Sequence, residues 1–96
     1  MSRLLRATIA FLSASEGGRA TPAMTGVRPQ LKVGDVFTST IVRSEDPEVD
    51  VFEPGRQYNV TLEMVFWDTY GQLVDLGGPV ELFDGRRLIA RGVFRR

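Results

Sequence analysis

The strongest constraint on the fold is an alternation of apolar and polar residues with a period of two. This period is typical of β-strands that bury one face. It is clearest over residues 58–67, where β-branched and aromatic residues alternate with polar ones. The buried face of this predicted strand carries Tyr58, Val60, Leu62 and Met64. Its opposite face carries Asn59, Thr61 and Glu63, which we expect to meet solvent.

Further strands are predicted wherever the same period recurs between turn signals. Their ranges are residues 3–13, 30–43, 49–52, 79–83 and 87–95. Gly34-Asp35 interrupts the second of these ranges, and a glycine within a strand pattern predicts a bulge or bend. Asp84-Gly85-Arg86 joins the last two ranges and predicts a hairpin. No stretch has the period of an amphipathic helix, so residues 13–26 and 68–78 are expected to be loops.

Six short antiparallel strands with no helical pattern predict an all-β domain, either a barrel or a sandwich. A closed barrel is the more economical solution, because a small open sheet would leave two reactive edges. The 96 residues suffice for one hydrophobic core. We therefore expect a single domain over residues 1–96, folded as a six-stranded antiparallel closed β-barrel.

The chain contains neither cysteine nor histidine. Disulfides and thiolate metal sites are thereby excluded, and so is every catalytic dyad or triad built on histidine. The carboxylates of residues 45–53 lack the oxygen spacing of a calcium loop. We expect no enzymatic activity, no metal and no cofactor.

Charge is balanced overall but unevenly distributed along the chain. Twelve basic and twelve acidic side chains give zero net charge. Residues 35–53 are predominantly acidic, whereas the C-terminal end is basic. The basic residues of that end are Arg86, Arg87, Arg91, Arg95 and Arg96. The first four of these are either a stripe that binds nucleic acid or part of a solvated face.

No run of about 20 apolar residues is present, so no membrane contact is expected. The first residues also lack the apolar core of a secretory signal, and the default expectation is a cytoplasmic protein.

One stretch of the chain is specific enough in sequence to suggest a protein family. Residues 16–22 read Glu-Gly-Gly-Arg-Ala-Thr-Pro, and residues 26–30 read Gly-Val-Arg-Pro-Gln. Pro54-Gly55 follows, then Asp84-Gly85-Arg86-Arg87 and finally Gly92-Val93. In order and spacing these motifs resemble the C-terminal β-barrel, the third domain, of translation elongation factor Tu and its relatives.

The resemblance implies a six-stranded antiparallel barrel that has no chemistry of its own. In that family the barrel contacts the backbone of the tRNA T stem and packs against a GTPase domain. The printed sequence contains no Gly-x-x-x-x-Gly-Lys-Ser/Thr motif. The partners implied are therefore tRNA-like RNA or a separate GTPase or translation protein. The contacts carried over from the family are Arg19, Gln30, Ser39, Asp84 and Gly85. Arg87 joins them as a member of the basic stripe.

A second set of residues is expected to shape the long loop that precedes residue 30. Its members are Glu16, Gly17, Gly18, Pro22 and Arg28. Arg19 has a structural alternative to RNA contact, in which it joins Arg28 in pairing a carboxylate and pinning the loop. Gly17 and Gly18 are expected to meet backbone needs at positive φ, because no helix follows them to cradle a phosphate.

The aromatic residues Phe66, Trp67 and Tyr70 are either an interface anchor or a plug at the mouth of the barrel. For the whole chain, the alternative to an RNA- or protein-binding module is a structural or oligomerisation domain. Exposed apolar surface on a barrel favours self-association.

Overall fold

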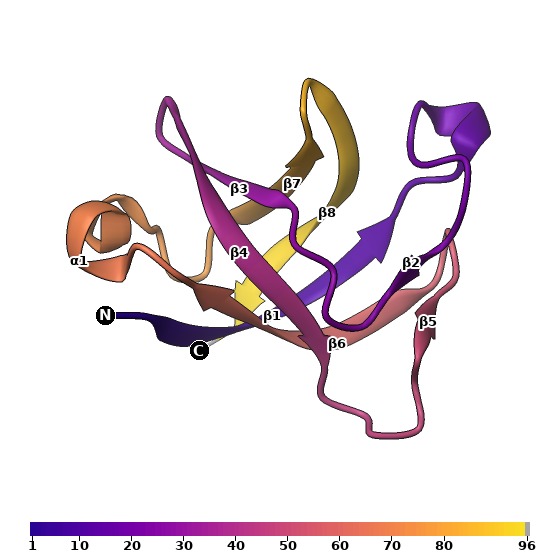
Figure 1. Cartoon of the computed structure of the whole chain (residues 1–96), viewed down its shortest axis with the longest axis horizontal. Helices are drawn as coiled ribbons and strands as arrows, with labels where there is room; N and C mark the ends of the chain where they lie inside the picture. The colour runs from indigo at the N-terminus through magenta and orange to yellow at the C-terminus, as the bar shows by residue number, and fades with distance from the viewer. Residues whose placement is uncertain (96) are drawn as a thin grey trace.

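The computed structural model describes residues 1–95, and Arg96 lies outside the described residues. Six antiparallel strands close into a barrel in the order β1-β6-β4-β3-β7-β8 (Figure 1). The strands are β1 (Arg3–Phe11), β3 (Gln30–Val33), β4 (Val36–Ser44), β6 (Gln57–Met64), β7 (Pro79–Asp84) and β8 (Arg87–Arg95). The predicted all-β, six-stranded closed barrel is confirmed.

The six barrel strands differ in part from the six that the sequence predicts. Residues 30–43 form two strands rather than one, because Gly34-Asp35 is a two-residue hairpin turn and not a bulge. Gly34 has φ 57°, whereas Asp35 has negative φ, because no non-glycine residue has positive φ within residues 1–95. Positive φ at the first central position alone is the pattern of a type II′ turn. The hairpin supplies the sixth barrel strand, since the predicted strand at residues 49–52 lies outside the barrel.

That outlying strand is β5 (Val51–Phe52), and it pairs with β2 (Ala23–Met24). We call this two-stranded sheet the flap. β2 falls within the loop predicted for residues 13–26, so that prediction is wrong at this point. The same loop begins with a 3₁₀ turn, η1 (Ala14–Glu16). Figure 1 shows the flap at one end of the barrel and α1 (Trp67–Tyr70) at the other.

The connection after β6 is also more ordered than predicted. β6 ends at Met64, and α1 then makes one helical turn that continues into η2 (Gly71–Leu73). Trp67 was expected at the end of the strand and instead begins the helix. No helix among residues 1–95 is long and apolar enough to span a membrane.

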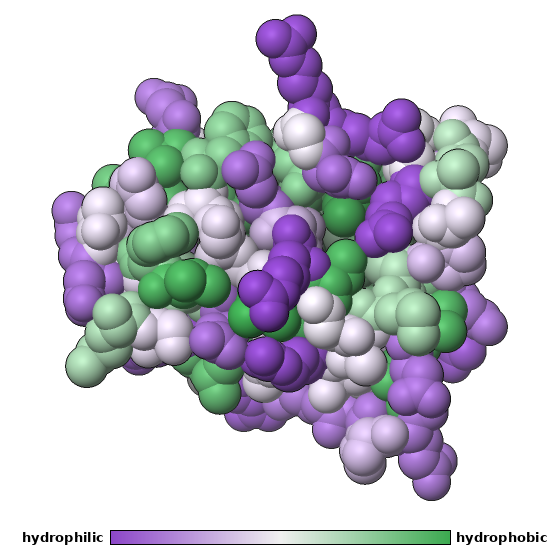
Figure 2. Space-filling view, in the orientation of Figure 1, coloured by the Kyte–Doolittle hydropathy of each residue, from purple (hydrophilic) through white to green (hydrophobic). Residues whose placement is uncertain are grey.

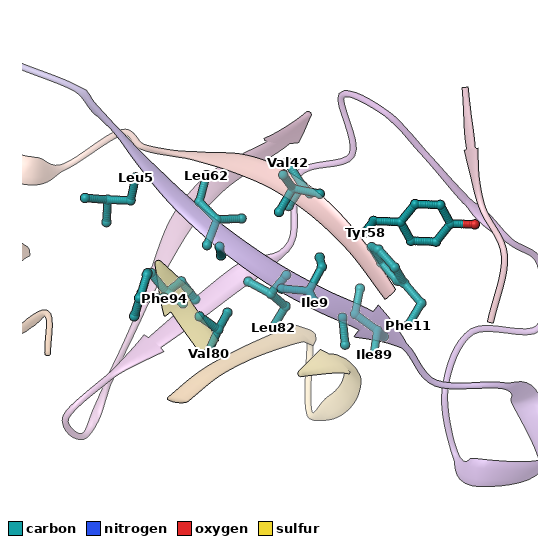
Figure 3. Close-up of a cluster of buried hydrophobic side chains, with 14 of the residues drawn as sticks. Leu5, Ile9, Phe11, Val42, Tyr58, Leu62, Val80, Leu82, Ile89 and Phe94 are labelled. Atoms are coloured by element: carbon teal, nitrogen blue, oxygen red, sulfur yellow. The ribbon is translucent and has the colours of Figure 1, made fainter. Parts of the chain in front are cut away.

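Alternate residues of the barrel strands fill most of the interior, as a period of two requires, although β4 and β8 also contain consecutive buried residues. Val60, Leu62 and Met64 are fully buried and Tyr58 nearly so, which confirms the predicted inner face of β6. Figure 3 shows these side chains converging with those of the other strands. The labelled contributors are Leu5, Ile9, Phe11, Val42, Tyr58, Leu62, Val80, Leu82, Ile89 and Phe94. The barrel is therefore a packed core, and function must lie on its outer face or ends.

Candidate nucleic-acid interface

The outer face of the barrel brings Gln30 and Ser39 together. They are cross-strand partners in the β3–β4 hairpin, and both are exposed. On its other side Gln30 pairs with Phe83 of β7, the residue that precedes Asp84. Gln30 and Ser39, two residues suggested by the family resemblance, are therefore neighbours of the β7 residue that leads into the β7–β8 hairpin.

The β7–β8 hairpin carries three more candidate residues. The hairpin predicted at Asp84-Gly85-Arg86 is confirmed: Asp84 pairs with Arg87, and Gly85-Arg86 forms the two-residue turn. Gly85 has φ 62°, again at the first central position of a two-residue turn. Asp84, Arg86 and Arg87 line a shallow, open hollow at this tip. The tip is short, exposed and rich in hydrogen-bond donors.

The glycine-rich loop is joined to this hairpin. A guanidinium nitrogen of Arg87 donates a hydrogen bond to the Gly18 carbonyl over 3.4 Å. Gly18 and Arg87 are 69 residues apart in the chain. Arg19 follows Gly18 directly and is half-buried. The loop and the hairpin therefore form one continuous surface, which we call the loop–hairpin surface and define by Arg19, Asp84, Gly85, Arg86 and Arg87.

Glu16 closes the turn that presents the two glycines. Its carboxylate accepts hydrogen bonds from the Ser13 backbone N–H and from the Ser13 hydroxyl, both over 2.9 Å. Both hydrogen bonds lower the pKa of the Glu16 carboxyl below its ordinary value, and the bond from the Ser13 backbone N–H has the larger effect. The charge of Arg91 acts in the same direction, which places another β8 arginine near the loop.

Gly17 and Gly18 are required for different reasons. Gly17 has φ 91°, as the expectation of positive φ predicts. Gly18 has ordinary φ, so the expectation is wrong for it. A Cβ atom at Gly18 would lie 2.3 Å from the Leu12 carbonyl oxygen. Gly18 is therefore needed because two backbone segments approach closely.

Ion pairing by arginine does not pin the loop. Among the described residues, neither Arg19 nor Arg28 lies within ion-pair distance of a carboxylate. Arg28 acts only at longer range. The pKa of the Glu63 carboxyl is lowered chiefly by a hydrogen bond from Arg43, with a smaller contribution from the charge of Arg28.

Backbone hydrogen bonds hold the loop instead. The Gly26 N–H donates to the Val42 carbonyl over 2.7 Å, and the Val42 N–H donates to Val27 over 2.9 Å. The buried Thr40 hydroxyl donates to the Pro29 carbonyl over 2.9 Å. Pro22 is exposed and leads directly into β2.

The basic stripe predicted along β8 is only partly available. The Glu45 carboxylate forms ion pairs with both Arg95 and Arg6. The Arg6 Nε atom lies 3.0 Å from Oε1 of Glu45. Arg95 is thus neutralised and cannot serve as a free phosphate contact. Arg86, Arg87 and Arg91 form no ion pair within residues 1–95 and leave a shorter stripe at the β7–β8 hairpin and along β8. The predicted stripe is corrected by this loss of its far end.

Sequence reasoning missed the aromatic neighbours of this surface. Phe37 packs edge-on against Phe83, with ring centroids 5.1 Å apart, and Phe37 is 45% exposed. The available signal was a phenylalanine at an outward position of the period-two pattern in residues 36–44. Comparison of the chain with protein-family models finds no model that matches it, so the function proposed below depends on its own residues and geometry.

Proposed function

We propose that this protein is a non-enzymatic binding module whose loop–hairpin surface contacts the phosphate backbone of a structured, tRNA-like RNA. The proposal rests chiefly on the contact between Arg87 and the Gly18 carbonyl. That contact makes one surface of two segments that carry family-like motifs. Exposed arginine side chains and backbone N–H groups are typical phosphate ligands.

The charge of the surface supports contact with phosphate. Arg19, Arg86 and Arg87 have no carboxylate within 4.0 Å among the described residues, so their guanidinium groups remain available. Asp84 is the one carboxylate of the surface and limits its net charge. We therefore expect modest affinity with a strong dependence on salt, because few phosphates are neutralised.

Resemblance to the third domain of elongation factor Tu supports the same proposal. The resemblance extends from the Glu16–Gln30 stretch to the final hairpin. The RNA would be held by its backbone and shape, with little dependence on base sequence. A protein partner of the translation machinery is the corresponding alternative at this surface.

Titration of fluorescently labelled tRNA against the protein tests the proposal. We expect the logarithm of the binding constant to fall with the logarithm of salt concentration with a slope of about −2 to −3, for about three phosphate contacts. Arg19→Ala and Arg87→Ala should each make that slope shallower by about one. Arg56→Ala is the matched control, because Arg56 is exposed but pairs with Glu53 outside the surface. No binding at ~50 mM salt would refute the proposal.

Self-association is the second candidate function, and the flap favours it. Met24 and Val51 are cross-strand partners with outward side chains that are 60% and 41% exposed. A two-stranded sheet with apolar residues on its surface is a template for pairing with a second copy. Analytical ultracentrifugation over a hundredfold concentration range measures whether the protein is a monomer or a dimer. A dimer that Met24→Lys converts to monomer supports self-association, whereas a monomer throughout removes it.

A further inference from the structure

The edge of β4 is open where β6 ends, at the opposite end of the barrel from the flap. β6 pairs with β4 only between Thr40 and Ser44. The Val65 N–H makes one more bond, to the Ser39 carbonyl over 3.3 Å, before the chain turns away into α1. The first residues of β4, Val36 to Thr38, therefore have a neighbouring strand on the β3 side alone.

The free backbone groups of this edge include the N–H and C=O of Phe37. Successive residues of a strand direct their N–H and C=O groups to opposite sides. The Thr40 N–H bonds to Pro29, on the β3 side, and the Ser39 carbonyl bonds to Val65, on the β6 side. Phe37 lies two residues before Ser39, so its N–H and C=O also face the β6 side. No backbone group among residues 1–95 pairs with them. Such a pair is a template for an added strand.

A hollow of about 210 Å³ lies between this edge and α1. Its lining residues are Phe37, Thr38, Ser39, Phe66, Thr69 and Tyr70. Phe66 is 52% exposed, and Phe37 is supported from behind by its edge-on contact with Phe83. Figure 2 shows green, apolar residues on the side of the molecule where α1 lies. Rigid aromatic rings on both walls suit an apolar anchor side chain.

We infer that this edge and hollow bind an extended polypeptide segment of a partner protein, which adds to β4 opposite Phe37 and inserts one apolar side chain between Phe37 and Phe66. The inference goes beyond the proposed RNA contact and uses an adjoining part of the surface, because Ser39 lines the hollow but does not belong to the loop–hairpin surface. Main-chain hydrogen bonds would supply affinity, and the side-chain hollow would supply specificity, as in other strand-addition interactions.

Charge and size favour this occupant over others. Every residue that lines the hollow is uncharged, so a phosphodiester backbone would find no cation there. One cation near this edge is Lys32, which pairs in register with Phe37 and forms no ion pair within the described residues. A carboxylate beside the anchor of the peptide would complement it. A hollow of about 210 Å³ suits a single anchor side chain. The unpaired backbone groups of Phe37 favour an extended segment over a helix, because a helix satisfies its own backbone N–H and C=O groups internally.

Capped pentapeptides of sequence Thr-Thr-X-Thr-Thr test the inference directly. The readouts are the NMR shifts of the Phe37 backbone amide and of the indole of Trp67, which starts α1 beside Phe66. With X as leucine or phenylalanine we expect saturable shifts of both signals, and with X as alanine at least tenfold weaker binding. Methylation of the backbone nitrogen of X should also weaken binding at least tenfold, because it removes the N–H that donates to the Phe37 carbonyl.

Protein variants distinguish binding at this site from non-specific binding to exposed apolar residues. Phe66→Ala removes one wall of the hollow and should weaken the leucine peptide at least tenfold. Val93→Ala removes a similarly exposed apolar side chain from β8 and should leave binding unchanged. The inference is overturned if no shift occurs at millimolar peptide, or if N-methylation has no effect. It is also overturned if a uridine hexanucleotide binds instead, or if the Phe37 signal depends on protein concentration without peptide, which would identify a second copy as the occupant.

Discussion

At the scale of single residues, the adjacent glycines at 17 and 18 show how one motif can combine two physical requirements. Gly17 adopts a left-handed conformation at the end of η1, which side chains disfavour. Gly18 lets the loop backbone contact the Leu12 carbonyl. The carbonyl of Gly18 then accepts the bond from Arg87. The first glycine turns the loop, and the second positions it against the barrel and the hairpin.

Gly18→Ala is therefore expected to destabilise the protein and to disturb the loop–hairpin surface. Its Cβ would have to displace backbone, and overpacking of this kind costs about 1–3 kcal/mol. Urea unfolding followed by Trp67 fluorescence measures the loss. Ala20→Ser, at an exposed position two residues away, should change the free energy of unfolding by less than about 0.5 kcal/mol. Equal stability of Gly18→Ala and the wild type would show that Leu12 and the loop separate readily.

At the scale of elements, the flap is small in extent yet attached to the core by one aromatic cluster. Phe52 is fully buried and stacks on Phe11 with ring centroids 5.0 Å apart. It also meets Tyr58 edge-on at 5.1 Å. The Tyr58 hydroxyl in turn accepts a hydrogen bond from the Glu53 N–H over 2.8 Å. β5 thus contributes to the barrel core although it lies outside the barrel sheet.

Phe52→Ala should lower the free energy of unfolding by about 3–5 kcal/mol, because it removes a buried ring and both of its aromatic contacts. Its neighbour Val51 points outward, so Val51→Ala should change stability by less than about 0.5 kcal/mol. Chemical denaturation of both variants, monitored by circular dichroism, makes the comparison. If the two variants lost similar stability, the flap would not share the barrel core.

The elements also show which parts of the fold the sequence pattern predicts and why it does not predict the others. The inner face of β6 follows from its period of two, because burial selects the same residues that the pattern does. Gly34-Asp35 predicts a bulge or bend within one strand but forms a hairpin turn between two strands, although Gly-Asp between two β-runs is a recognised hairpin signal. β2 has only two residues, too few to show a period, so its pairing with β5 could not be predicted from local pattern.

At the scale of the whole molecule, the site depends on contacts between distant segments, which sequence patterns do not report. The motif residues could be selected by resemblance, but the bond from Arg87 to Gly18 spans 69 positions. The bridge formed by Glu45 likewise joins Arg6, near the start of the chain, to Arg95, near its end. Only closure of the barrel brings β8 beside β1 and places these partners together.

The Glu45 bridge leads to a prediction about the closed barrel. Arg6 and Arg95 are cross-strand partners on β1 and β8, and like charges in that relation repel. Glu45 follows β4 directly and accepts hydrogen bonds from both guanidinium groups, so it offsets the repulsion and links three strands. Glu45→Gln should therefore lower the free energy of unfolding by about 1 kcal/mol, since the network is partly exposed.

Salt distinguishes this cause from a simple loss of packing. Glutamine nearly matches glutamate in shape, so the loss should come from charge and should shrink as added salt screens the two arginines. Urea unfolding of wild type and Glu45→Gln at low and high salt measures the change. Glu48→Gln is the matched control, because Glu48 is exposed in the following loop and lies within 4.0 Å of no basic group among residues 1–95. If both variants responded alike, the effect would belong to net charge, and the join between β1 and β8 would depend on backbone pairing and core packing alone.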